Sequence, residues 1–156
     1  MKYILILIII FITISVYIEY HRYRNVENRD IVQYREQLNN YSLESYSRLI
    51  ARVLYAEANG ESDIDKIAVG SSILNRTDNI EFPSSIDSVI YQKNQYAIAN
   101  KFTKHDLQIA TCLLEDYFRD CNIMYFFNPK TITNKVHLKN IRKKELILKT
   151  KNHEYY

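Results

Sequence analysis

The chain has 156 residues, of which 47% are apolar and 25% charged, a size and composition that suit one folded domain and exclude intrinsic disorder. Only two Gly and two Pro are present, too few for the turns of an all-β fold or for a Gly-rich phosphate-binding fold. The net charge is +3, but residues 25–156 contain 18 Lys and Arg against 17 Asp and Glu, so we expect no nucleic-acid partner.

The N-terminal segment is strongly apolar. Residues 3–18 carry no charge and, as a helix, would cover about 24 Å of a hydrocarbon core about 30 Å thick. Tyrosines at the end of this run could extend it into the headgroup zone. Residues 15–20, at the end of this run, read SVYIEY and contain no Ala-x-Ala cleavage pattern. This favours an uncleaved signal-anchor over a cleaved signal peptide. We therefore predict a transmembrane helix at residues 1–20, in contact with the membrane through residues 3–20.

Residues 21–40 are polar and charged, with Ile31, Tyr34 and Leu38 at helical spacing. This pattern predicts a helical juxtamembrane stalk, although a solvated first helix of the domain itself fits it equally. The folded domain is expected to occupy residues 41–156.

The chain contains two cysteines, Cys112 and Cys121. They could form a disulfide in an exported domain, or they could remain two unpaired thiols. Their spacing does not match a metal site, and we expect neither a metal nor a cofactor.

The first half of the domain has the apolar spacing of helices. Ser42 is expected to cap a helix that ends near Gly60. The apolar positions of this helix are Tyr46, Leu49, Ile50, Val53 and Leu54. Ser62, with Asp65 three residues later, resembles a capping box at the start of a second helix. The apolar stripe of the second helix comprises Ile64, Ile67, Ala68, Ser71 and Leu74.

Two shorter helices and a β-prone region are expected next. Residues 83–85 introduce a third helix, residues 92–103 form a polar loop, and Thr103 caps a fourth helix. The apolar face of the fourth helix comprises Leu107, Ala110, Leu114 and Tyr117. The β-prone segments are Ile123–Phe127, Val136–Leu138 and Leu146–Leu148, before a tail at His153–Tyr156. We predict an α+β domain that is mostly α, with a small β-hairpin region near its end.

Glu57 is the candidate catalytic residue. It follows Val53 by four residues and Ile50 by seven, so it shares their apolar face at the end of the first domain helix. Burial disfavours a carboxylate and raises its pKa, and such a carboxyl group can donate a proton near neutral pH. The alternative that the pattern leaves open is a Glu57 that faces water or pairs with Arg52 or Arg76.

Several short segments resemble the motifs of one family. LIARVLYAEANGE at residues 49–61 resembles the opening motif of the cell-wall hydrolase family typified by the spore cortex-lytic enzyme SleB. Further family-like segments follow in order. They are IAVGSSILNR at 67–76, FP at 82–83, IDSVIYQ at 86–92, QY at 95–96, YFFNP at 125–129, NH at 152–153 and YY at 155–156. The resemblance covers about residues 46–156.

The resemblance implies a lysozyme-like fold and a lytic transglycosylase that cuts the glycan strands of peptidoglycan. Glu57 aligns with the catalytic acid. It would protonate the oxygen between N-acetylmuramic acid and N-acetylglucosamine and then accept the proton of the muramic 6-hydroxyl, which leaves a 1,6-anhydro end. A two-carboxylate glycosidase would instead need a partner about 5–10 Å away. Glu61 is the candidate for that partner, or it supports the loop beyond Gly60. The domain would lie on the cell-wall side of the membrane, in the periplasm or at the cell exterior.

Six further residues are candidates for binding the glycan, because amide and aromatic groups suit sugar hydroxyls and N-acetyl groups. These candidates are Asn75, Arg76, Gln95, Tyr96, Tyr125 and Asn128. Asn75 and Arg76 could instead cap the second helix. Phe126 or Phe127 is expected in the core.

Two features depart from the family pattern. Residues 133–138 read TNKVHL where relatives carry a Ser-Lys-Trp-like stretch, so a stacking Trp is absent, and Cys121 stands where small Gly residues are expected. An alternative function is therefore a catalytically weak, membrane-tethered peptidoglycan-binding module. A third is a tethered interaction protein, because the cations within residues 139–151 form either a solvated face or a surface for anionic glycan or lipid.

Overall fold

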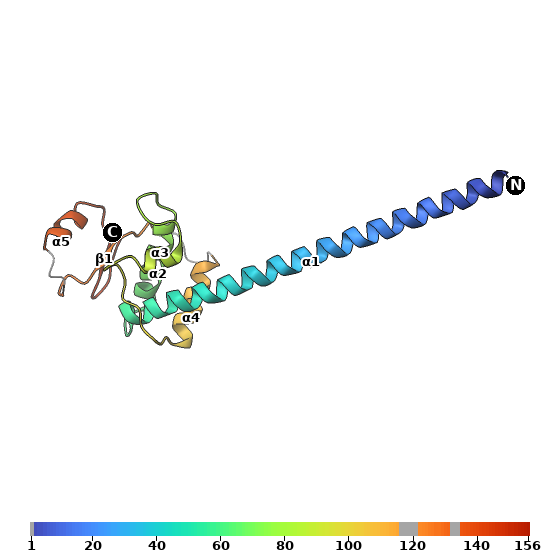
Figure 1. Ribbon diagram of the computed structural model, residues 1–156. Coiled ribbons are helices and arrows are strands. Elements are labelled where there is room, and N and C mark those ends of the chain that lie inside the picture. The colour runs from blue at the N-terminus through green and yellow to red at the C-terminus, as the bar shows by residue number, and fades with distance from the viewer. Residues whose placement is uncertain (1, 116–121, 132–134) are drawn as a thin grey trace. The chain divides into compact units, whose positions relative to one another are not determined.

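A computed structural model gives the arrangement of the chain, and it describes residues 2–115, 122–131 and 135–156. The chain divides into two units, Met1–Ser42 and Leu43–Tyr156. One helix, α1 (Lys2–Ala58), begins in the first unit and ends in the second (Figure 1). The second unit contains all the other helices and the sheet.

The first unit consists of α1 residues. The described side chains between residues 13 and 42 are all exposed. Among the described residues, no helix is long and apolar enough to cross a membrane. The side chains of residues 2–12 lie outside the described part of the chain, and the transmembrane helix expected at residues 1–20 is not confirmed. Residues 21–40 are helical, which fits both the stalk and the alternative of a first helix of the domain.

Ser42 does not cap a helix, because α1 continues through it. Its hydroxyl donates to the Asn39 carbonyl at 2.9 Å, a bond that serines make within helices. No Gly or Pro precedes Gly60, so the sequence contains no helix breaker over this length. The predicted end of the helix is confirmed. α1 ends at Ala58, and Gly60 has a φ of +83°, in the left-handed region that glycine adopts readily.

The second helix, α2 (Asp63–Thr77), begins at Ser62 as predicted, where the Ser62 hydroxyl accepts the Asp65 N–H at 3.3 Å. Ile64, expected in the apolar stripe, is instead 58% exposed. It lies in the first turn, before the helix enters the core, whereas Val69, outside the expected stripe, is fully buried. The helix is therefore buried over more than one face.

Two capped helices follow α2. Ser85 caps α3 (Ile86–Ile90), and Thr103 caps α4 (Lys104–Leu114) in a reciprocal capping box with Asp106. The stretch between these helices, which the structure describes throughout, has no helix or strand, in agreement with the predicted polar loop.

The structure describes only some of the residues on which the remaining predictions near α4 depend. Cys112 is a free cysteine on α4. Cys121 lies outside the described residues, and so does Tyr117, expected on the face of the fourth helix.

A small antiparallel sheet follows, with its strands in the order β1-β3-β2. The strands are β1 (Phe126–Phe127), β2 (Leu148–Lys149) and β3 (Glu154–Tyr155). Tyr155 pairs with Phe126 on one side and with Leu148 on the other. The last segment of the chain, predicted only as a tail, is thus the central strand. A hairpin does lie near the end of the domain, but β2 and this last segment form it.

The prediction of a β segment at Val136–Leu138 is wrong, because these residues lie in a fifth helix, α5 (Lys135–Ile141). Ile141 is buried and Leu138 packs against the same cluster three residues earlier, whereas Val136 is 72% exposed. Buried side chains three residues apart share one face of a helix, whereas those on one face of a strand are two residues apart.

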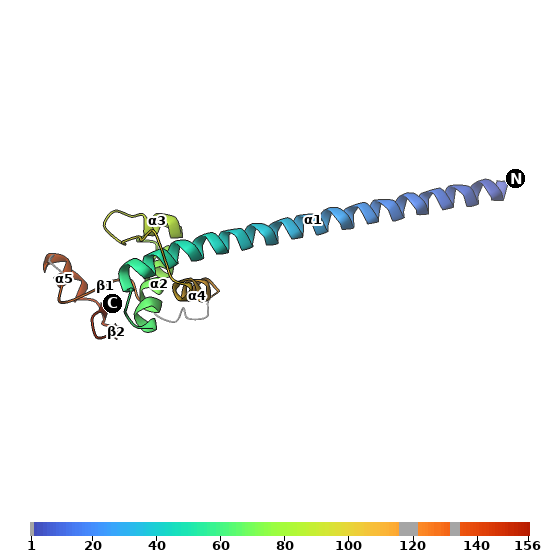
Figure 2. The ribbon, with the colours of Figure 1, turned by 90° about the horizontal axis from the view of Figure 1, so that it is seen from below.

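The core of the second unit is mainly helical. α2 packs against both α3 and α4, an arrangement that Figures 1 and 2 show from two sides. The largest fully buried side chains are Tyr155, Ile50, Leu54, Ile73, Ile90, Leu113 and Ile123. A second cluster of Phe127, Ile141 and Tyr156 joins the sheet to α5. The predicted α+β domain, mostly α with a small sheet, is confirmed.

Candidate active site

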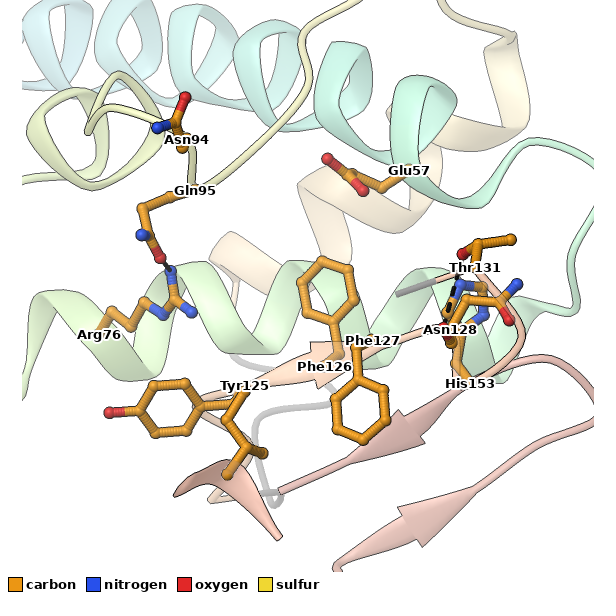
Figure 3. Close-up of a pocket in the computed structure, with 11 residues that line it drawn as sticks. Glu57, Arg76, Asn94, Gln95, Tyr125, Phe126, Phe127, Asn128, Thr131 and His153 are labelled. Atoms are coloured by element: carbon orange, nitrogen blue, oxygen red, sulfur yellow. Dashed lines mark hydrogen bonds between the residues drawn. The ribbon is translucent and has the colours of Figure 1, made fainter. Parts of the chain in front are cut away.

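A cavity of about 580 Å³ lies in the second unit, between the end of α1 and the sheet (Figure 3). Figure 3 shows Arg76 and Gln95 at one end of it and Asn128 and His153 at the other. Five of the eight predicted site residues line this cavity. They are Glu57, Arg76, Gln95, Tyr125 and Asn128.

Glu57 lies at the last turn of α1, half-buried, with its carboxylate in the cavity. Its Oε1 accepts a hydrogen bond from the Ala97 N–H at 2.5 Å, from the loop before α4. Burial raises the pKa of Glu57 above its ordinary value, and the Ala97 N–H and the charge of His153 only partly oppose this. The group is therefore suited to carry a proton at higher pH than an exposed glutamate.

Glu57 does not pair with Arg52 or Arg76, the alternative that the sequence pattern left open. Arg52 donates to the Ala99 carbonyl at 2.6 Å, and the Arg76 guanidinium donates to the Met124 carbonyl at 2.8 Å. Both cations thus bind backbone oxygen, and the raised pKa of Glu57 is not offset by either of them.

Arg76 is buried in an aromatic cage at one end of the cavity. Its guanidinium carbon lies 5.0 Å from the ring centroids of Phe82 and Tyr96 and 5.6 Å from that of Tyr125. The same group donates to the Gln95 Oε1 at 3.0 Å. Because a guanidinium only donates, the carbonyl side of Gln95 faces Arg76, which leaves its amide N–H₂ as a donor for a ligand.

Three predicted site residues do not line the cavity. The Asn75 amide donates to the Ile123 carbonyl at 3.0 Å, which ties α2 to the segment before the sheet. Tyr96 shares a hydrogen bond of 2.9 Å with the Ser72 hydroxyl. Both side chains thus support the cavity wall from behind.

Glu61, the candidate second carboxylate, is also outside the cavity lining. Both of its oxygens accept from the Asn152 amide at 3.0 Å, which links the loop after α1 to the loop before β3. This contact agrees with the loop-supporting alternative for Glu61.

Sequence reasoning missed Asn94, Thr131 and His153, which also line the cavity. His153 stands in one of the family-like segments, but its place opposite Glu57 depends on the order of the strands, which no local pattern reveals. Phe126 and Phe127, expected in the core, form part of the cavity wall as well as packing into the two clusters. Within the described ranges, no group of three or more His, Cys, Asp or Glu side chains could hold a metal ion.

A family model described as Cell Wall Hydrolase matches residues 60–156 of the chain. The chain belongs to this family. The match begins three residues after Glu57, so the assignment of that residue rests on the cavity geometry and on the sequence motif.

Similar proteins agree with the family. This cell wall hydrolase is 30% identical over 94 residues to a spore cortex-lytic enzyme of Bacillus cereus, a match that covers 56% of this chain and 36% of the relative. A spore cortex-lytic enzyme of Oceanobacillus iheyensis is 30% identical over 93 residues, which covers 34% of that protein. The chain thus spans about a third of the length of the curated relatives it matches.

Two solved structures resemble the fold of this cell wall hydrolase. The catalytic domain of the Bacillus cereus SleB protein matches with a TM-score of 0.61 and 25% identity, over 70% of this chain and 87% of that domain. The catalytic domain of SleB from Bacillus anthracis, described as a germination-specific lytic transglycosylase, matches with a TM-score of 0.59 and 25% identity, over 68% and 88%. Both similarities cover most of a catalytic domain.

Proposed function

We propose that this cell wall hydrolase cleaves peptidoglycan glycan strands between N-acetylmuramic acid and N-acetylglucosamine, as a lytic transglycosylase with Glu57 as its acid. The observation that carries the proposal is the carboxyl group of Glu57, whose pKa is raised by burial at the wall of a cavity large enough for sugar rings.

The chemistry requires two proton transfers. The Glu57 carboxyl gives its proton to the oxygen that links the sugars while the bond from muramic C1 to that oxygen breaks. The muramic 6-hydroxyl then bonds to C1, and its proton returns to the Glu57 carboxylate. The product has a 1,6-anhydro end, no water is consumed, and the enzyme recovers its starting protonation state.

The neighbourhood of Glu57 supports a mechanism with one carboxylate. Glu61 is held by Asn152 and does not line the cavity, so it supplies no second carboxylate there. The Ala97 N–H stabilises Glu57 once it has become a carboxylate. The Gln95 amide and the Tyr125 ring offer a hydrogen-bond donor and a stacking surface for N-acetyl groups and sugar faces.

Peptidoglycan lies outside the cytoplasmic membrane, so the proposed substrate places the domain at residues 41–156 on the cell-wall side. The anchor at residues 1–20 and the stalk at 21–40 remain predictions from the sequence.

Mass spectrometry of muropeptides tests the proposal. Purified peptidoglycan incubated with the full chain should release fragments with 1,6-anhydromuramic ends, and the Glu57→Gln chain should release none. New reducing muramic ends in place of anhydro ends would show hydrolysis instead of the proposed transfer. Binding to the glycan without any cleavage would favour the alternative of a binding module.

A further inference from the structure

A buried carboxylate lies behind the cavity wall. Asp65, in the first turn of α2, is 2% exposed. It accepts hydrogen bonds from the hydroxyls of Ser62 at 2.6 Å, Thr150 at 2.6 Å and Tyr155 at 2.7 Å. Burial raises the pKa of Asp65, but the three hydroxyl donors outweigh it, and the pKa lies below its ordinary value. Asp65 is therefore a carboxylate throughout the neutral pH range.

The imidazole of His153 also lies beside this carboxylate. Its Nδ1 lies 3.4 Å from the Asp65 Oδ1, and its side chain is 10% exposed. Nδ1 is buried and makes no hydrogen bond with any described residue. The ring packs near Phe126 and Tyr155, with centroid distances of 6.5 and 6.0 Å. A proton on Nδ1 would satisfy this atom by pointing at Asp65, and a buried anion favours the charged imidazolium.

His153 also lines the cavity that contains Glu57. The two nitrogens of an imidazole point in different directions, so a ring that turns Nδ1 toward Asp65 turns Nε2 away from it. The positive charge of His153 opposes the effect of burial on Glu57 and lowers its pKa. His153 thus lies 3.4 Å from Asp65 and lines the same cavity as Glu57, so it is placed to act on both carboxyl groups.

We propose that Asp65 and His153 form a carboxylate–imidazolium pair in the cavity wall, in which His153 is a positioning residue that stabilises the Glu57 carboxylate between its two proton transfers. This inference rests on the proposed function of Glu57 as proton donor and acceptor. His153 keeps its own proton throughout, so the proton count of the reaction is unchanged. Its contribution is the charge that compensates Glu57 after the first transfer, in a site where burial alone would disfavour the anion.

Other charged and ionisable groups lie near the pair or along the same cavity. Arg76 lines the same cavity and carries a permanent charge, and Tyr96 interacts electrostatically with Glu57. Burial and Asp65 raise the pKa of Tyr155, so its hydroxyl stays neutral and continues to donate to Asp65. Two further groups are Glu61, which acts on Tyr155, and Lys144, whose ammonium lies 4.8 Å from the Tyr125 ring centroid. All of these are retained when His153 alone is replaced.

The test replaces His153 with glutamine, which is neutral and keeps hydrogen-bonding capacity. Loss of a nearby cation raises the pKa of a carboxyl group, so in His153→Gln the Glu57 carboxyl should titrate about one pH unit higher than in the unaltered chain. Carbon NMR of the labelled Glu57 carboxyl in the full chain measures this without any catalysis. The pH at which kcat/KM falls on the alkaline side should move up with it, and kcat at neutral pH should fall about tenfold.

A matched control is available in the same chain. His105 on α4 pairs with Asp63 at 2.8 Å, but its side chain is 52% exposed and lies outside the cavity lining. His105→Gln should change neither the Glu57 titration nor the pH profile. An equal shift in both variants, or no shift in His153→Gln, would overturn the inference even if the unaltered chain cleaves glycan. An inactive chain whose Glu57 titration still responds to His153 would instead overturn the proposed function alone.

Two further variants keep the inference testable if His153→Gln does not fold. His153→Asn, a smaller neutral replacement, should raise the pH at which the Glu57 carboxyl titrates, as in His153→Gln. An unchanged Glu57 titration in this variant would contradict the coupling. In an Asp65→Asn background, the additional His153→Gln change should shift the Glu57 titration less than it does alone, because the ring has lost its pairing with Asp65. A full-sized shift there would overturn the role of Asp65.

Discussion

The Glu57 carboxyl group, at the end of α1, experiences two opposing effects on its pKa. Burial favours the protonated acid, whereas the Ala97 N–H favours the carboxylate. A residue that must give up a proton and then regain it needs both forms to be accessible. The apolar spacing of the last turns of α1 provides the burial, and the loop before α4 provides the N–H.

Glu57→Gln should abolish glycan cleavage without lowering thermal stability. The amide keeps the shape of the side chain and can still accept the Ala97 N–H, but it has no proton to transfer. General acid catalysis is typically worth about 10²–10⁴-fold in rate, and with one carboxylate the loss should reach the upper end of that range. Rates of glycan cleavage together with thermal unfolding curves measure both effects. Glu61→Gln, which changes a loop contact, should keep measurable activity, and an active Glu57→Gln chain would contradict the assignment.

Part of the site could be predicted from the sequence, Glu57 by helix periodicity and a further set by residue type within family-like segments, namely Arg76, Gln95, Tyr125 and Asn128. Glu57 follows from its spacing to Ile50 and Val53. Asn75 has a suitable polar group, but its amide is used by a buried carbonyl, a contact formed across 48 positions of the chain. His153 could not be assigned, because its contact with Asp65 depends on long-range packing of β3 against α2.

Among the elements, α2 and α4 are joined by a buried ion pair. Lys66 on α2 lies 2.6 Å from Asp106 on α4, and their side chains are 9% and 1% exposed. Asp106 also accepts from the backbone N–H and the hydroxyl of Thr103 at the start of α4. The pair thus connects the two helices at the same residue that completes the capping box.

Asp106→Asn should destabilise the domain by about 3 kcal/mol, because it leaves the Lys66 ammonium buried without its anion. Burial raises the pKa of Asp106, but the bonds from Lys66 and Thr103 outweigh it and lower the pKa overall. Its stabilisation is therefore complete above the ordinary aspartate pKa and is lost as the pH falls through the lower folded value. Denaturant unfolding from pH 7 down to acid should show the difference between the two chains shrinking, and a constant difference would contradict this origin. Replacing the pair together, Lys66→Met with Asp106→Leu, should cost less than Asp106→Asn.

The helix boundaries illustrate which elements a sequence determines locally. Ser62 and Thr103 were predictable caps, because each satisfies a backbone N–H group within three residues, and Ser85 does the same in the segment expected to introduce the third helix. Ser42 has the same chemistry but stands in a stretch without helix breakers, so the helix continues through it. The strand predicted at Val136–Leu138 failed because three β-prone residues are too few to define a period, and the buried Ile141 selects the helix.

Among the side chains that the structure describes, all the buried ones lie in the second unit. The described side chains between residues 13 and 42 are exposed, whereas full burial begins with Ser47 and Ile50. The chain end closes the same core, since Tyr155 on β3 is fully buried and its hydroxyl reaches Asp65 on α2. The second unit therefore contains the described residues that form the core and those that line the cavity.

A chain that begins at Leu43 should keep the fold and the glycan-cleaving activity of the full chain. Deleting residues 1–42 removes none of the buried side chains that the structure describes. Changes at exposed positions typically alter stability by less than about 0.5 kcal/mol, so the midpoint of thermal unfolding should change by no more than about 4 °C. Thermal unfolding and muropeptide release by the shortened chain measure the two properties.

A chain that begins at Leu54 is the matched control. It lacks Ile50, Ala51 and Val53, which are all fully buried. Full burial of each large aliphatic side chain is worth about 1.5–3 kcal/mol, so the loss of these residues approaches the stability of a typical domain. This chain should not fold, although it still contains Glu57. A folded chain from Leu54, or an unfolded one from Leu43, would show that the boundary between the self-sufficient unit and the rest of α1 lies elsewhere on the helix.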